Sequence, residues 1–130
     1  MDCQFIEHAE TLPRVTPPGH AGTLNIKLVD RQFCGRFEML HGIVQPGGEA
    51  ETHYHETEYQ VIYIIAGEVE VTLGDRQPVR CKTGSIICIP PKLSHRVVNV
   101  GDTPFEAIVI YSPPLQHHHS DMSETAPGRP

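Results

Sequence analysis

The chain has 130 residues and a formal net charge of −6 with histidine neutral. This length accommodates one domain that buries a core without disulfides, and it excludes two full domains. The chain has 16 acidic and 10 basic residues. This acidic excess argues against a nucleic acid or a membrane surface as partner, because both attract clustered Lys and Arg. Its 11 glycines and 12 prolines, with no tryptophan, favour short strands and turns over a helical bundle.

The four cysteines form no Cys-x-x-Cys pair, and the first ten residues, MDCQFIEHAE, are too polar for a signal peptide. We therefore expect a reduced, cytoplasmic protein. The longest apolar run, Val61 to Ala66, is far shorter than the roughly 20 residues that cross a bilayer. No membrane-spanning segment is predicted.

In chain order, residues 1–22 are rich in proline and are predicted to form an extended N-terminal arm. Residues 23–112 then show alternating or short apolar runs bounded by Gly, Pro or Asp, which predicts an all-β domain. The expected strands are Thr23–Val29, Arg36–Val44, Thr52–His55, Tyr59–Ile65, Glu68–Leu73, Val79–Lys82, Ser85–Ile89, Arg96–Asn99 and Phe105–Tyr111. Gly67 provides the positive φ of a tight hairpin between the fourth and fifth of them.

Residues 113–130 have little apolar content and are predicted to form a disordered C-terminal tail. The tail includes His117, His118 and His119, a run that we expect to bind metal only adventitiously. The strand Tyr59–Ile65 is apolar on both faces, so its outer face needs a cover. We expect a homodimer, with the first 20 residues as an alternative cover.

The most informative motif is His53-Tyr54-His55. Alternate residues of a strand point the same way, so both imidazoles leave one face roughly 6 to 7 Å apart and can share a cation. Gln60 reaches the same face if the short loop after His55 turns the chain back. His95 supplies a third imidazole, which predicts a metal site of three histidines and one amide.

These residues resemble the cupins, a family of small β-barrels. The first family motif is matched by Gly47, His53, His55, Gln60 and Gly67, with Gln in place of the usual Glu. The second is matched by Gly84, Pro90, Lys92, His95 and Asn99, with Lys in place of Gly. The resemblance covers residues 23 to 112 and implies a single-domain double-stranded β-helix, or jelly-roll barrel.

By that resemblance, His53, His55 and His95 are metal ligands, and Gln60 stands at the position of the acidic ligand. The ion is divalent, with Zn, Ni, Mn, Co and Fe(II) all possible. Three neutral imidazoles and a neutral amide leave the charge of the ion uncompensated, which makes it a stronger Lewis acid that is held less tightly. The missing carboxylate favours non-redox chemistry over oxidation.

Other polar residues near the motifs keep more than one interpretation. Glu58 has the same parity as Gln60, so it is a candidate ligand or catalytic base; otherwise it belongs to a solvated acidic loop. Tyr63 and Tyr111 are candidate pocket residues, but Tyr63 lies on the face opposite Gln60 and fits packing better. Lys92 lies in the loop before His95, near the expected rim of the barrel.

We therefore expect a metal-dependent enzyme in which the ion polarises a carbonyl or hydroxyl of a small polar metabolite, such as a carbohydrate or organic acid, during isomerisation, elimination or cyclisation. Two alternatives use the same barrel. One is a metal-dependent dioxygenase, and the other is a non-catalytic module that binds or senses a small molecule.

Overall fold

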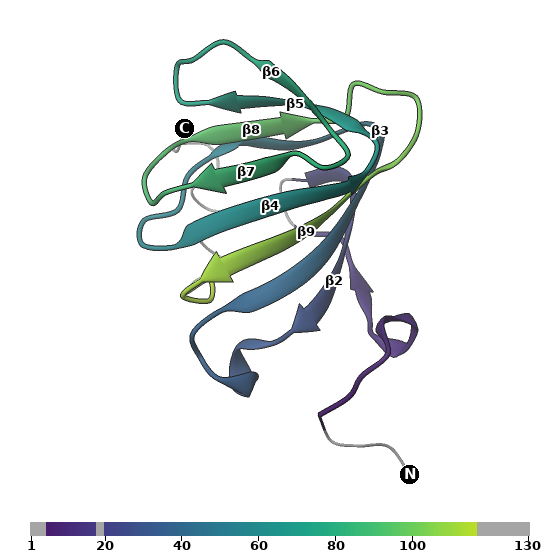
Figure 1. The fold of residues 1–130 in the computed structure, drawn as a ribbon, viewed down its shortest axis with the longest axis vertical. Helices are drawn as coiled ribbons and strands as arrows, with labels where there is room; N and C mark the ends of the chain where they lie inside the picture. The colour runs from purple at the N-terminus through teal and green to yellow at the C-terminus, as the bar shows by residue number, and fades with distance from the viewer. Residues whose placement is uncertain (1–4, 18–19, 117–130) are drawn as a thin grey trace.

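The computed structural model describes residues 5–17 and 20–116, and nine strands make up one curled sheet (Figure 1). The strands are β1 (Arg14–Val15), β2 (His20–Val29), β3 (Glu38–His53), β4 (Tyr59–Ala66), β5 (Glu68–Leu73), β6 (Val79–Lys82), β7 (Ile86–Ile89), β8 (His95–Val98) and β9 (Phe105–Ser112). Within those residues the helical elements are two short 3₁₀ turns, η1 (Ala9–Thr11) and η2 (Arg31–Phe33). The all-β prediction is confirmed, and no described helix is long and apolar enough to cross a membrane.

Strand β3 differs from the sequence-based expectation, because Arg36–Val44 and Thr52–His55 were expected as separate strands. They belong to one 16-residue strand that continues through Pro46, Gly47 and Gly48. Its first half pairs with β9 and its second half with β8, while β2 runs along it from Met39 to Ala50. Gly47 has a φ of 82°, a conformation that glycine adopts without strain. The strand therefore bends at the glycines and passes from one side of the barrel to the other.

The strand order brings distant parts of the chain together. The order is β6-β5-β8-β3-β9-β4-β7, with β2 paired to β3 and β1 paired to β2. Figure 1 shows that β4 and β8 begin, and β7 and β9 end, on the same side of the curled sheet, at the left of that view. Residues of both sequence motifs lie at this end of the barrel.

Alternation along β4 separates an inner from an outer face. Gln60, Ile62 and Ile64 are buried, whereas Tyr63 and Ile65 are 46% and 40% exposed. The inner residues join a core of aliphatic side chains and one phenylalanine: Val44, Ile62, Ile64, Val69, Val71, Ile87, Ile89, Val97, Phe105 and Ala107. The predicted division of the two faces is confirmed, and the outer face is apolar and exposed in a single chain.

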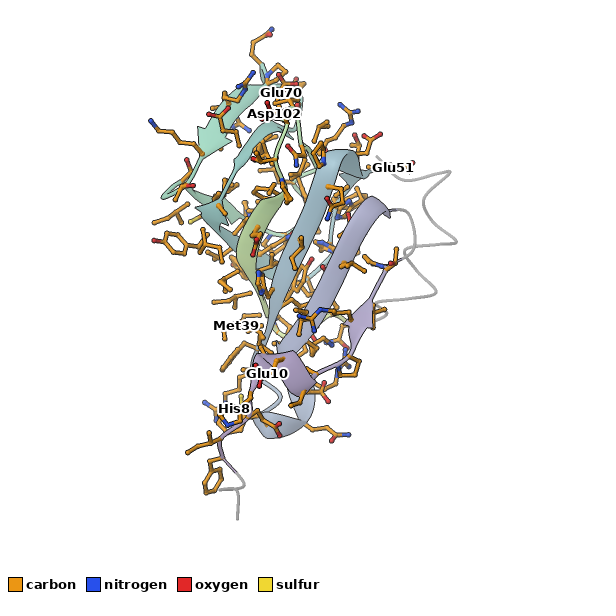
Figure 2. The ribbon with its side chains drawn as sticks, turned by 90° about the vertical axis from the view of Figure 1, so that its right-hand side faces the viewer. His8, Glu10, Met39, Glu51, Glu70 and Asp102 are labelled. Atoms are coloured by element: carbon orange, nitrogen blue, oxygen red, sulfur yellow. The ribbon has the colours of Figure 1, made fainter. Side chains whose placement is uncertain are left out.

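The first described residues, from residue 5, lead into this barrel. The expected arm contains η1 and β1, which pairs with β2 through Arg14 and Ile26, and β2 begins two residues before the expected end of the arm. Figure 2 shows His8 and Glu10 far from Glu51 on β3. Residues 117–130, which hold the histidine run, lie outside the described residues.

Candidate metal centre

Three histidines converge at the end of the barrel where β8 begins. His53 is the last residue of β3 and pairs in register with His95, the first residue of β8. His55 follows two residues later, and one ring nitrogen from each histidine lies within 4.8 Å of those of the other two. The ring centroids are 4.3 to 5.4 Å apart. The structure thus brings together the three imidazoles that the motif spacing predicts, at a separation suited to one shared cation.

Backbone carbonyls orient two of these rings. His53 Nδ1 lies 2.6 Å from the carbonyl oxygen of Glu51, and His95 Nδ1 lies 3.0 Å from that of Leu93. A carbonyl oxygen can only accept, so each Nδ1 is the donor, and in the neutral ring Nε2 then keeps its lone pair. The Lys92 amide donates to the His55 carbonyl over 2.7 Å, which ties the two ligand-bearing loops together. This arrangement favours metal coordination through Nε2.

Gln60, at the start of β4, is buried beside the histidines. Its Nε2 donates to the Tyr111 hydroxyl over 3.2 Å. Its Oε1 is buried and has no hydrogen-bond partner within the described residues. An unsatisfied buried acceptor costs about 1 to 3 kcal/mol, and a cation beside it would remove that cost. The donor set of three imidazoles and one amide oxygen therefore fits a divalent metal, and Gln60 stays a predicted ligand.

Tyr111, one of the two tyrosines considered as pocket residues, lines the cavity beside the histidines, but its contact with Gln60 was not foreseen. It pairs with Gln60 across β9 and β4, and its ring centroid lies 5.3 Å from that of His55. Burial raises the pKa of the Tyr111 phenol, and the nearby carboxylates of Glu38 and Glu58 raise it further. The phenol is therefore neutral at physiological pH. Its place beside Gln60 depends on strand register, which periodicity alone does not provide.

Glu58 does not belong to a solvated acidic loop, so that interpretation is wrong. The side chain is buried, at 6% exposed. Its carboxylate accepts from the backbone amides of Gln116 at 3.1 Å and Thr57 at 3.4 Å. Glu58 is not among the residues that line the cavity beside the histidines, so its predicted roles as ligand or base gain no support from its contacts.

A second buried carboxylate, that of Glu38, also accepts a hydrogen bond from the backbone after β9, as Glu58 does. It is 1% exposed, accepts from the Leu115 amide at 2.8 Å and pairs with Lys27 Nζ at 2.9 Å. Arg31 also donates to the Leu115 carbonyl. Residues 113–116, the first part of the expected tail, are therefore held against the barrel, and Pro114 is buried. We call these four residues the C-terminal strap.

The barrel interior beside the histidines holds a small cavity of about 80 Å³. Its lining combines the site residues with a mostly aliphatic wall: Thr23, Asn25, Leu40, Gly42, Val44, Ala50, His53, Gln60, Ile62, His95, Val97, Phe105, Ala107, Val109 and Tyr111. None of these is an acidic residue, a lysine or an arginine. The ligand cluster thus opens onto an uncharged space.

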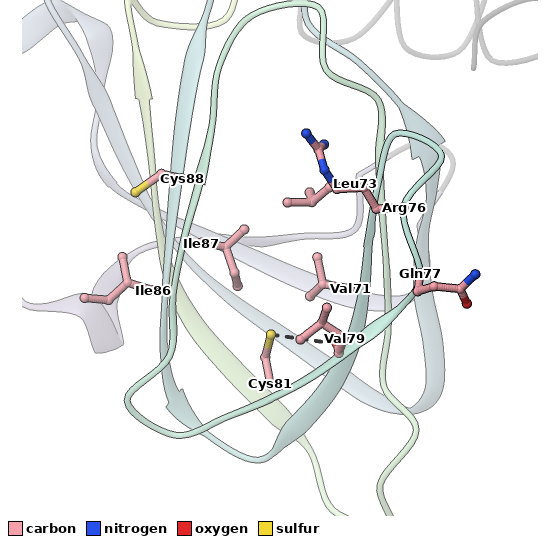
Figure 3. A pocket seen from close by; sticks show the side chains of 9 residues that line it. All are labelled: Val71, Leu73, Arg76, Gln77, Val79, Cys81, Ile86, Ile87 and Cys88. Atoms are coloured by element: carbon pink, nitrogen blue, oxygen red, sulfur yellow. Dashed lines mark hydrogen bonds between the residues drawn. The ribbon is translucent and has the colours of Figure 1, made fainter.

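A larger cavity of about 230 Å³ lies elsewhere, between the edge strands β6 and β7 (Figure 3). Apolar side chains line most of it, together with Cys81 and Cys88, and Arg76 and Gln77 contribute the remaining polar groups. Burial raises the pKa of the Cys81 thiol, which disfavours the thiolate that binds metals. This cavity contains none of the predicted ligands.

Other motif residues have structural roles. Asn99 is 1% exposed and makes three hydrogen bonds: Nδ2 donates to the carbonyls of Val44 and Thr103, and Oδ1 accepts from the Gly101 amide. Lys92 replaces the family glycine and has a φ of 72°, the one positive value at a non-glycine residue in the described part of the chain. The residue thus occupies a conformation that favours glycine.

Comparison with known proteins identifies the family and the fold. The Cupin domain family matches residues 40–111. The uncharacterized protein MJ1618 of Methanocaldococcus jannaschii is 31% identical over 86 residues, which cover 66% of this chain and 68% of that protein. A glucose-6-phosphate isomerase of Thermococcus onnurineus is 31% identical over 78 residues, or 55% of this chain and 41% of the isomerase. The polyketide cyclase RemF of Streptomyces resistomycificus has a similar fold, with a TM-score of 0.74, 24% identity and 94% of each chain covered.

Proposed function

Because the chain belongs to the cupin family, whose Cupin domain matches residues 40–111, we propose that it is a metal-dependent enzyme of non-redox chemistry. The proposed reaction is an isomerisation, elimination or cyclisation of a small metabolite with carbonyl or hydroxyl groups. The observation that carries this proposal is the convergence of three histidine nitrogens within 4.8 Å. The buried Gln60 oxygen supplies a fourth neutral donor beside them.

His53, His55 and His95 would hold the ion, with Gln60 as the fourth ligand. When bound, a divalent ion polarises a carbonyl or hydroxyl oxygen of the substrate. Neutral ligands do not compensate its charge, which suits Zn, Ni, Mn, Co or Fe(II) in a Lewis-acid role. The names of the relatives are consistent with such chemistry, since one is an isomerase and another a cyclase.

The protein's own groups support this role. The carbonyls of Glu51 and Leu93 fix the rings of His53 and His95. The Tyr111 phenol stays protonated and meets Gln60 at the edge of the cavity. Because Gln60 donates to the phenol oxygen, the phenol hydrogen is left to donate elsewhere. Tyr111 is therefore the group that we assign to donate to a substrate oxygen.

The experiment uses the metal-loaded protein and a panel of small hydroxyketones in deuterated buffer. We expect metal-dependent exchange or migration of the proton beside the carbonyl, measured by ¹H NMR. The rates of this reaction should be equal in air and under argon. Exchange that is no faster than with the His53→Ala/His95→Ala variant for every hydroxyketone would contradict the proposal. Turnover that needs air and consumes oxygen would favour the dioxygenase alternative.

We also propose that two copies of the chain associate through the outer face of the sheet. Ile86, Tyr63 and Ile108 lie in register across β7, β4 and β9, and the first two are 64% and 46% exposed. An uncharged row of this kind can match its own copy about a two-fold axis. Sedimentation should show a dimer for the parent and a monomer for Tyr63→Glu; a monomeric parent would contradict the proposal.

A further inference from the structure

The cavity beside the histidines has a polar end and an apolar wall. His53, Gln60, His95 and Tyr111 mark the polar end. The remaining lining is formed mainly by aliphatic side chains and Phe105, with Thr23 and Asn25 as the polar exceptions. A molecule whose oxygen atoms face the ligand cluster would therefore place the rest of its body against apolar atoms.

Several charged groups near this end of the barrel are engaged with one another or with the backbone. The Glu38 carboxylate pairs with Lys27, and Arg31 donates to the carbonyl of Leu115. Glu58 accepts from the strap at Gln116. Arg96, close in sequence to His95, pairs with Glu49 at 2.7 Å. Among the described residues, no lysine or arginine lines the cavity to meet a second anionic group of a substrate.

The cavity is also small. Its volume of about 80 Å³ is roughly half of the 150 Å³ that accommodates benzene in an engineered protein cavity. The strap is held to the barrel at Glu38 and Glu58, and Glu38 pairs in register with Tyr111 across β3 and β9. Tyr111 therefore lies near both the cavity and the strap, and Pro114 of the strap is buried.

We propose that the site selects substrates that carry one metal-binding oxygen group on a short, uncharged and apolar body. This inference rests on the proposed function and narrows its substrate class. Sugar phosphates and dicarboxylic acids are disfavoured, because their second charge would be buried without a cationic partner. A single anionic oxygen group is acceptable only where it meets the ion.

Matched hydroxamic acids test this selectivity, because they share one metal-binding group and differ at the far end. The protein is the complete chain with His117→Ala, His118→Ala and His119→Ala, loaded with cobalt. Dissociation constants for acetohydroxamic acid, butyrohydroxamic acid and succinic monohydroxamic acid are measured from the visible cobalt spectrum. We expect the succinic compound, with its distal carboxylate, to bind roughly a hundredfold more weakly than the butyric one, or about 2.7 kcal/mol.

A cation placed in the wall should reduce this preference. Val109 lines the cavity two residues before Tyr111 on β9. Val109→Lys should improve binding of the succinic compound relative to the butyric one by about tenfold, whereas Val109→Met, of similar length without charge, should not. Circular dichroism and cobalt content confirm that each variant folds. If Val109→Lys does not fold, the inference is decided by the parent protein alone, from the ratio of its dissociation constants for the succinic and butyric compounds.

Equal or tighter binding of the succinic compound by the parent would overturn the inference. Retention of cobalt without binding of any of the three acids would also overturn it, while leaving the metal centre intact. Failure to bind cobalt at the histidines would instead overturn the proposed function. The two failures are therefore distinguishable.

Discussion

Asn99→Ala tests whether this motif residue holds the fold or serves the metal. The change removes three hydrogen bonds of 2.9 Å each, two donated by Nδ2 and one accepted by Oδ1. At about 1 kcal/mol per bond, the free energy of unfolding should fall by about 3 kcal/mol. That is a large part of the 5 to 15 kcal/mol typical of a domain.

Urea denaturation of the metal-free protein, followed by far-UV circular dichroism, measures this loss. With a slope of about 2 kcal/mol per molar urea, the midpoint should fall by about 1.5 M. Gln77→Ala, at an exposed amide, is the matched control and should change the free energy by less than about 0.5 kcal/mol. The metal content of the folded Asn99→Ala protein should equal that of the parent. A loss below about 1 kcal/mol, or a loss of metal from folded protein, would refute the structural role.

Three further changes test other parts of the account. Gly67→Ala should lower the free energy of unfolding by about 3 kcal/mol or more, because at a φ of 88° the new Cβ would lie 2.6 Å from the Pro104 carbonyl oxygen. Gly35→Ala is the control, since Gly35 has a φ of 73° and no atom within 4 Å of the added Cβ. Equal losses for the two variants in urea melts would refute the clash. Lys92→Gly should raise the free energy of unfolding by about 0.5 to 1 kcal/mol in the same melts, because glycine adopts the positive φ of this position without strain. A clear fall in that free energy would show that the Lys92 side chain is needed. The folded-state pKa of Tyr111 is raised, so the stability it contributes is complete below its ordinary value of 10.0 and is lost as pH rises above that value. Tyr111→Phe should therefore reduce the decline in unfolding free energy above pH 10, and an unchanged decline would contradict the assigned burial.

Much of the fold follows from local patterns. Glu68–Leu73 begins and ends as alternation predicts, because it has an apolar face toward the core and turn residues at its ends. Val79–Lys82 also has the predicted bounds, although Val79 is exposed and Cys81 is only partly buried. Strand β3 was harder to predict, since Pro46 and the following glycines look like a break. Its continuity comes from pairing with β2, β8 and β9, which no local signal contains.

The candidate site divides in a similar way. The three histidines were predictable from their spacing. His53 and His55 lie two residues apart at the end of β3, and His95 begins the neighbouring strand β8. Tyr111 was a candidate pocket residue and does line the cavity, but its contact with Gln60 and the burial of Glu38 were not predictable, because they depend on strand register and on the strap. Glu58 resembles its solvated acidic neighbours in sequence, and only the amides of Thr57 and Gln116 explain its burial.

The central claim is that His53, His55 and His95 hold one metal ion. The most direct measurement is the metal content, by mass spectrometry, of the complete chain in which His117, His118 and His119 are alanine. We expect about one divalent ion per chain after reconstitution, and its loss in a folded protein that also carries His53→Ala and His95→Ala. No bound ion in the first protein, or equal binding in the second, would contradict the account.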